Sequence, residues 1–172
     1  MIGSIIDSPL GPLLALMNAA GGLSGLEFPR GREVASMLRA AGDPVRQDAF
    51  GAHVRRALDA YFSGSRAPMD LELAMRGTPF QRTVWSGLRL IPYGVTWTYG
   101  QLAEAIGRPG AARAVGRANG SNPVAIIVPC HRVIGAGGRL VGYSGGVRAK
   151  RLLLEHEATH GPQESVASAL SP

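Results

Sequence analysis

The chain has 172 residues, 45% of them hydrophobic, which is enough to form a hydrophobic core in one ordinary domain or two small ones. Its single cysteine excludes an intramolecular disulfide and an all-cysteine zinc site, and no apolar run approaches the roughly 18 to 20 residues that span a bilayer. The first residues lack a basic stretch followed by a small-residue cleavage site. We therefore expect no metal, no membrane partner and a cytoplasmic location.

The net charge of +6 is concentrated in the middle of the chain. Residues 1–76 carry eight arginines against eight acids, and residues 147–172 carry three basic residues against three acids. Residues 77–146 carry seven arginines against one acid, Glu104, so the whole excess lies there. An arginine-rich segment of this kind is typical of a surface that faces a polyanion. The alternative is a basic face that is only solvated, and nucleic acid is the partner that we favour.

Residues 1–76 predict a small α/β unit that supports the rest of the chain. Three apolar stretches, separated by Ser-Pro, Gly-Pro and Gly-Gly turn signals, predict short strands at residues 2–6, 13–17 and 23–28. The middle stretch fits a piece of helix equally well by its periodicity. Alternation in residues 70–73 predicts an edge strand, and residues 66–77 predict a linker. Apolar residues at helical spacing predict one amphipathic helix, namely Phe50, Val54, Leu58 and Tyr61.

Two helices after residue 77 begin with the same capping signal. Thr78 precedes a proline at the first helical position and stands three residues before Gln81, as a capping box requires. Thr98 repeats this spacing with Gln101. We expect the first of these helices to continue until Pro92-Tyr-Gly94 stops it.

A third helix, from residue 111 to about 118, follows the turn Gly107-Arg-Pro-Gly110 and completes a helix-turn-helix pattern. Most of its side chains are those of alanine or glycine, which are too short to hydrogen-bond base edges in a groove. Arg113, near its start, is the one long side chain well placed to enter a duplex. We therefore expect DNA binding that is largely independent of sequence.

The only cysteine follows a stiff apolar segment. Residues 124–128 are all apolar, Pro129 fixes the backbone next, and Cys130 is followed directly by His131. A thiolate is the nucleophilic form of cysteine, and a neighbouring base makes it available. A free cysteine is more often a small buried residue of the core, so the Cys-His pair alone does not decide whether Cys130 is a nucleophile. Adjacent residues of an extended segment point apart, which favours a relay through water over direct pairing.

Together these features resemble the O6-alkylguanine-DNA alkyltransferase family of direct-reversal repair proteins. Matching motifs run in the family's order from about Thr78 to Glu157, whereas residues 1–76 match only weakly. Some relatives hold structural zinc through N-terminal cysteines, which this chain lacks. The motifs are Phe80-Gln81, Val84-Trp85, Ile91-Pro92-x-Gly94, Tyr99-x-Gln-Leu-Ala103, Ala112-Arg-Ala-Val-Gly116, Asn122-Pro-Val124, Pro129-Cys-His-Arg-Val133 and Gly142-Tyr-Ser-Gly-Gly146.

The resemblance implies a self-inactivating transfer without a cofactor. Cys130 would attack the alkyl carbon, His131 would take the thiol proton through a water, and Glu157 would hold the imidazole. Asn122 would be the hinge between the helix-turn-helix and the cysteine segment. Because the product is a thioether, each chain would act once. Without the resemblance, a structural ion pair between His131 and Glu157 is an equal alternative.

The resemblance also implies how DNA is held. A base inside a duplex is out of reach of the sulfur, so the damaged nucleotide would be flipped into a pocket. Arg113 would fill the vacated stack from the minor groove, and Tyr99 would help to rotate the phosphate. The helix backbone would lie along the groove at Ala112, Ala114, Gly116 and Arg117. The pocket would be formed by Val133, Tyr143, Ser144 and Gly145, with Ser144 against the alkylated oxygen.

These expectations give one α/β (α+β) architecture. It has an N-terminal α/β support domain at residues 1–76, a mainly helical alkyltransferase domain at 77–160, and a disordered tail at 161–172. We expect a monomer on double-stranded DNA, with cooperative binding left open. The range of alkyl groups and the repair of O4-alkylthymine are open as well.

Two other functions compete with alkyl transfer. A non-catalytic module that binds alkylated bases would use the same DNA-binding face. A hydrolase is suggested by Gly142-x-Ser144-x-Gly146, which fits a nucleophile elbow, but no aspartate follows in the remaining chain. A cysteine hydrolase that uses Cys130 and His131 is harder to dismiss from chemistry alone.

Overall fold

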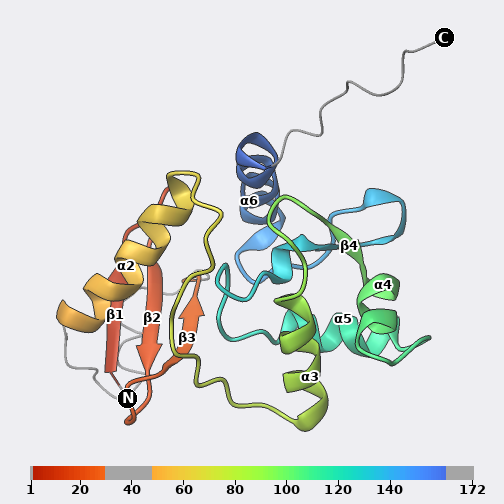
Figure 1. Cartoon of the computed structure of the whole chain (residues 1–172), viewed down its shortest axis with the longest axis horizontal. Coiled ribbons are helices and arrows are strands. Elements are labelled where there is room, and N and C mark those ends of the chain that lie inside the picture. Colours follow the sequence, from red (N-terminus) through yellow and green to blue (C-terminus); the bar gives the residue numbers. More distant parts are fainter. Residues whose placement is uncertain (1, 30–47, 162–172) are drawn as a thin grey trace.

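The computed structural model describes residues 2–29 and 48–161, and it has the mixed α+β architecture expected (Figure 1). Three antiparallel strands lie in the order β1-β2-β3: β1 (Ile2–Ile6), β2 (Leu13–Met17) and β3 (Leu23–Glu27). Helix α2 (Asp48–Phe62) covers one face of this sheet. A Cβ added to Gly51 would lie 2.9 Å from the Ser4 Oγ, so glycine permits this close packing. The 13–17 stretch is thus a strand and not a helix.

The second half of the chain is mainly helical. Its helices are α3 (Pro79–Leu88), α4 (Tyr99–Ala105), α5 (Ala112–Gly120) and α6 (Gly146–His160), with short 3-10 turns at Cys130–Arg132 and Ala136–Gly138. The two-residue strands β4 (Trp97–Thr98) and β5 (Val133–Ile134) pair in parallel. No helix in the described residues is long and apolar enough to cross a membrane.

Both predicted capping boxes are present. The Gln81 amide N–H donates to the Thr78 hydroxyl over 3.2 Å, and the Gln81 side chain accepts from the Thr78 N–H over 2.8 Å. Thr98 and Gln101 repeat both bonds at 3.2 and 2.7 Å. These reciprocal bonds satisfy two orphan donors at each helix start, which is why the local sequence determined both starts so closely.

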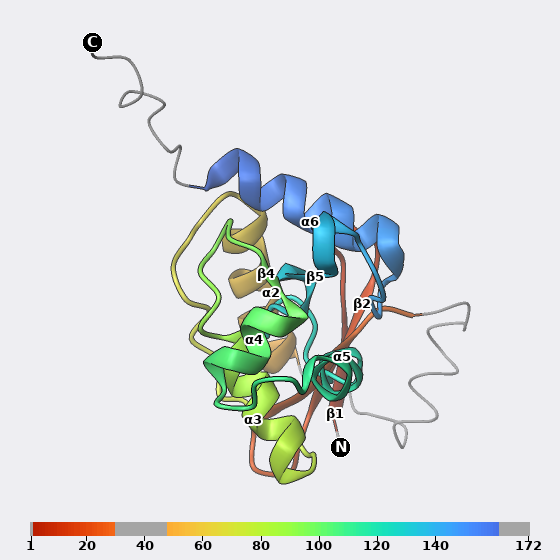
Figure 2. The ribbon, with the colours of Figure 1, turned by 90° about the vertical axis from the view of Figure 1, so that its right-hand side faces the viewer.

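The helix-turn-helix unit is formed by α4 and α5. Gly107 and Gly110 lie in the turn between them with φ of 70° and 81°, a region that favours glycine. Helix α3 packs behind this unit, and the Trp85 indole N–H donates to the Ala118 carbonyl of α5 over 2.9 Å. Figure 2 shows α3, α4 and α5 grouped beneath α6. The expected basic face therefore stands on a packed three-helix support.

The N-terminal sheet is joined directly to the segment that leads to Cys130. The Leu26 N–H donates to the Pro123 carbonyl over 2.8 Å, and the Ala125 N–H donates to the Leu26 carbonyl over 2.9 Å. One cluster of buried apolar residues also includes side chains from both halves. The domain boundary near residue 77 stays a prediction.

Two predicted element limits are wrong. Residues 70–73 form no strand, and only a single bridge joins Leu73 to Leu23. The bridge consists of two hydrogen bonds, from the Leu23 N–H to the Glu72 carbonyl and from the Ala74 N–H to the Leu23 carbonyl. Helix α3 ends at Leu88, and residues 89–91 continue as a tight turn of i to i−3 bonds ahead of Pro92. Of the predicted tail, residues 162–172 lie outside the described part.

Candidate active site and nucleic-acid interface

A closed loop delivers Cys130 to its position. The Asn122 side chain donates to the Val128 carbonyl over 2.9 Å and accepts from the Val124 N–H over 3.1 Å, so it closes residues 122–128 on themselves. Ile126, which is buried, has φ of 70° within this loop, an unusual conformation for a β-branched residue. Asn122 thus closes the segment that leads to Cys130, and its part as a hinge stays a prediction.

Cys130 and His131 are not in an extended segment. They begin a 3-10 turn, closed by a bond from the Val133 N–H to the Cys130 carbonyl. The expectation of an extended segment was wrong because Pro129 adopts ψ of 60°, which turns the chain at once. The turn is buried, with Cys130 3% exposed and His131 fully buried.

The Cys130 thiol holds its proton firmly in this surrounding. Burial raises its pKa to about 11, although the Asn122 side chain and the charge of Lys150 act in the opposite direction. A thiol of this pKa is almost wholly protonated at neutral pH. Any nucleophilic use of Cys130 therefore requires a base at the moment of reaction.

His131 has the protonation state and the free ring nitrogen that such a base needs. Its Nε2 lies 2.7 Å from the Glu157 Oε1, and its pKa is lowered, chiefly by burial, so the imidazole is neutral. A neutral ring that donates Nε2–H to a carboxylate leaves Nδ1 as an acceptor. Nδ1 is buried and has no hydrogen-bond partner in the described residues. The ring can therefore take one proton there.

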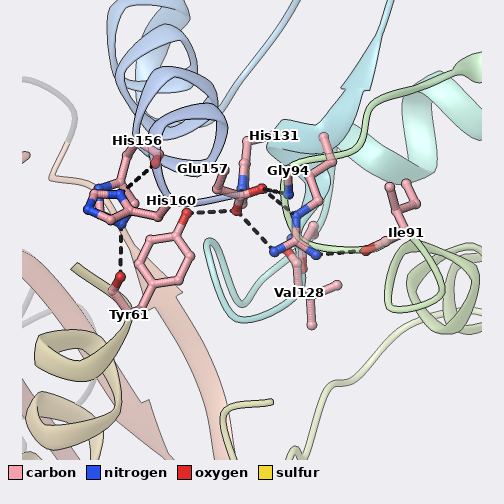
Figure 3. A network of polar contacts seen from close by, with 10 residues as sticks. Tyr61, Ile91, Gly94, Val128, His131, His156, Glu157 and His160 are labelled. Carbon is pink, nitrogen blue, oxygen red and sulfur yellow. Dashed lines mark hydrogen bonds and ion pairs between the residues drawn. The ribbon is translucent and has the colours of Figure 1, made fainter. Parts of the chain in front are cut away.

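Glu157 is the centre of a buried polar network (Figure 3). Besides His131, it accepts from the Tyr61 hydroxyl over 2.8 Å and from the Gly94 N–H over 3.0 Å. The Arg132 guanidinium donates to both carboxylate oxygens, over 2.8 and 3.0 Å. Burial raises the pKa of Glu157, but the bonds from His131 and Arg132 outweigh it and hold this pKa well below the usual range. The group is therefore ionised at neutral pH.

The expected DNA-binding face lies on α5. Arg113 and Arg117 are exposed, whereas Val115 and Ala118 are buried toward the other helices. A Cβ added to Gly116 would lie 3.7 Å from the Tyr99 ring, so Tyr99 lies against the helix at its glycine. Burial and then the charge of Cys130 raise the pKa of Tyr99. The Tyr99 ring therefore packs on α5 at Gly116. Ala112 and Ala114 are partly buried on the same helix.

Of the residues predicted to form the pocket, Tyr143 has a ring contact with His131 and the others stay a prediction. Tyr143 is buried, and its ring lies 6.3 Å from the His131 ring in an edge-on arrangement. Val133 is fully buried in β5, and Ser144 and Gly145 follow Tyr143 with partial burial. One cavity of about 540 Å³ is lined by Pro129 and Arg132 but not by Cys130.

Comparisons with known proteins agree with this geometry. Residues 79–159 match the family model described as 6-O-methylguanine DNA methyltransferase, DNA binding domain. A methylated-DNA–protein-cysteine methyltransferase from Mycobacterium tuberculosis is 50% identical over 92% of this chain and 93% of its own length. This chain belongs to the methylated-DNA–protein-cysteine methyltransferase family.

Other members support the assignment. The methyltransferase of Methanosarcina acetivorans is 45% identical over 92% of this chain and 99% of its own. The structure of M. tuberculosis OGT in complex with DNA superimposes with a TM-score of 0.82 at 45% identity, over 95% of this chain and 96% of that one. An O6-methylguanine DNA methyltransferase from Methanococcus jannaschii superimposes with a TM-score of 0.70 at 26% identity, over 90% and 93%.

Sequence reasoning missed Lys150 of this methyltransferase. Its ammonium is fully buried and donates to the Val133 and Val141 carbonyls over 2.5 and 2.9 Å, which ties β5 to the loop that follows. Burial lowers its pKa, and the Cys130 charge opposes this effect. Lys150 precedes Glu157 by seven residues, two helical turns on one face, and this spacing was the signal that could have found it.

Two residues of the N-terminal half were missed as well. Tyr61 was assigned only to the apolar stripe of its helix, yet its hydroxyl reaches Glu157. Phe28 packs edge-on against Tyr143 at 5.7 Å, and a Cβ added to Gly145 would lie 2.7 Å from its ring. The local sequence around Tyr61 and Phe28 carries no signal of these contacts. The described residues contain no cluster of three metal-binding side chains.

Proposed function

We propose that this methyltransferase repairs DNA by direct reversal, taking the alkyl group from O6-alkylguanine onto Cys130. The observation that carries this proposal is a protonated buried thiol, next in sequence to a neutral imidazole whose Nε2 is held by an ionised carboxylate. This is the nucleophile, base and orienting acid of a triad, with sulfur as the attacking atom.

The reaction needs no cofactor for its balance. The thiol proton passes, directly or through one water, to the Nδ1 of His131, and the Glu157 carboxylate stabilises the imidazolium that forms. The sulfur lone pair then forms a bond to the alkyl carbon while the bond from that carbon to O6 breaks. The electron pair of the broken bond stays with the guanine, which takes up one proton at N1, equivalent to the one that the thiol gave up, so that neutral guanine and neutral His131 are restored. The thioether has no good leaving group, so one chain repairs one base.

We propose that DNA is bound through α5 from the minor groove with little regard to sequence. Arg113 fills the space of the flipped nucleotide, and Tyr99 donates a hydrogen bond to the extruded guanine. The small side chains of α5 support this assignment, since they allow close approach to the sugar-phosphate backbone and offer little to base edges. We propose a monomer that acts in the cytoplasm, where the thiol stays reduced.

Intact-mass spectrometry separates transfer from mere recognition. The chain is incubated with a duplex that contains one O6-methylguanine, and Cys130→Ser is treated identically. We expect a gain of one methyl group per wild-type chain and none in the variant. Unchanged mass with retained binding of the modified duplex would instead establish the non-catalytic module. Release of a hydrolysed product with free Cys130 would point to a cysteine hydrolase.

A further inference from the structure

Tyr61 brings the N-terminal half of the chain into contact with the reaction centre. It lies in the last turn of α2 and is separated from Glu157 by 96 positions in the sequence. Its side chain is 3% exposed, and its hydroxyl donates to the Glu157 Oε1 over 2.8 Å. The His131 Nε2 contacts the same oxygen at 2.7 Å, as Figure 3 shows from close by.

The hydroxyl is held in place by its surroundings. The Tyr61 ring packs edge-on against Phe62 and Tyr93, with centroids 5.1 and 5.8 Å away, and the His156 ring lies 5.2 Å from it. The His156 Nε2 also lies 2.8 Å from the Tyr61 carbonyl, which fixes the backbone. Burial and the Glu157 charge raise the pKa of Tyr61, so the phenol remains a donor. Its direction and its protonation are both fixed.

Three donors share one carboxylate oxygen. The Glu157 Oε1 accepts from Tyr61, His131 and the Arg132 Nη2, whereas Oε2 accepts from Gly94 and the Arg132 Nε. A carboxylate offers about four lone-pair sites to these five bonds. Each donor stabilises part of the negative charge, so each one weakens the attraction that the same oxygen exerts on an imidazolium.

We propose that Tyr61 is a positioning residue for the transfer reaction, which sets the basicity and the orientation of His131 through the shared Glu157 oxygen. The proposal rests on the function proposed above and goes beyond it, because it gives residues 1–76 a defined part in the chemistry. Charged and titratable groups reach His131 from several elements: Cys130 and Arg132 of its own turn, Lys150 and Glu157 of α6, and Tyr143 of the following loop.

Tyr61→Phe removes only the hydroxyl and is the direct test. Tyr93→Phe is the matched control, because the Tyr93 ring neighbours both Tyr61 and Arg132 but its hydroxyl makes no hydrogen bond in the described residues. The single-turnover rate of transfer from O6-methylguanine duplex is measured from pH 5 to 9 for the three proteins. Loss of the Tyr61 donor makes His131 more basic, so in Tyr61→Phe the imidazole is protonated, and unable to act as a base, already at a higher pH than in the wild type. We expect the acid limb to move upward by about half a pH unit or more, with a lower plateau.

The rise in the basicity of His131 must also appear in the free protein, without any substrate. Titration of the His131 ring nitrogens by ¹⁵N NMR is expected to show a higher pKa in Tyr61→Phe than in the wild type and in Tyr93→Phe. Equal pKa values and equal acid limbs in the three proteins would overturn the proposal, whatever the plateau rates. A wild-type chain that gains no methyl group would refute the proposed function instead, and the NMR comparison would still decide the part of Tyr61.

Discussion

Replacement of Glu157 by glutamine tests the polar network most severely. The change keeps the shape of the side chain but removes the charge on which His131 and Arg132 depend. Because all five contacts to the carboxylate are made by donors, the new amide NH₂ must face at least one of them. The Arg132 side chain is only 11% exposed, so its charge would be left buried without a partner. Loss of one partner of a buried ion pair costs about 3 to 5 kcal/mol.

We therefore expect Glu157→Gln to lower the free energy of unfolding by about 3 to 5 kcal/mol in urea titrations at pH 7.5. We also expect the single-turnover transfer rate to fall by about 10² to 10⁴, the range assigned to a positioned acid or base. Glu155→Gln, on an exposed position of the same helix, is the matched control and is expected to change neither quantity. A loss below about 1 kcal/mol together with a rate within a few-fold of wild type would refute the reasoning.

The same network predicts acid sensitivity of the fold. The pKa of Glu157 in the folded chain lies below its unfolded value, so the stability that it contributes is complete above the unfolded pKa. That contribution is lost as the pH falls toward the folded pKa. Stability curves of wild type and Glu157→Gln should therefore converge as the pH is lowered from about 5. A difference between them that is independent of pH would contradict this sign.

Three further substitutions test other parts of the site. Lys150→Met leaves the buried Val133 carbonyl and the partly buried Val141 carbonyl without their donor and should cost about 2 to 5 kcal/mol in urea unfolding, whereas the exposed Arg151→Met should cost little. Equal losses of stability in the two variants would refute the structural role of the buried Lys150 ammonium. Arg113→Ala should slow transfer from duplex DNA by at least about tenfold and leave reaction with free O6-benzylguanine unchanged. Equal slowing with both substrates would contradict the proposal that Arg113 fills the space of the flipped nucleotide. Gly145→Ala brings a Cβ to 2.7 Å from the Phe28 ring, so it should slow transfer from both substrates. Phe28→Leu in the same chain should restore part of the rate, and an unchanged rate in Gly145→Ala would show that this contact does not shape the pocket.

Much of the site was predictable because its signals are local. The capping boxes at Thr78 and Thr98 satisfy helix donors within four residues, and the sequence shows them directly. Cys130, His131 and Glu157 followed from the ordered motifs of the family. The helix-turn-helix pattern followed from its glycine turn.

The remainder depends on packing between distant segments. Tyr61 meets Glu157 across 96 positions, and Phe28 meets Gly145 across more than a hundred, so neither contact leaves a local pattern. Lys150 entered the sequence analysis only as a basic residue in the charge count, because lysine is rarely buried unless paired. Its partners are two carbonyls whose orientation is set only by the tertiary fold.

The stoichiometry of repair tests the central claim most directly. With excess O6-methylguanine duplex, the restored guanine and the methylated peptide that carries Cys130 are quantified together at long times. We predict that both reach a plateau of one per chain, with the methyl group on the Cys130 sulfur and on no other residue. Continued formation of guanine beyond one equivalent, or a methyl group on another side chain, would contradict irreversible transfer to Cys130.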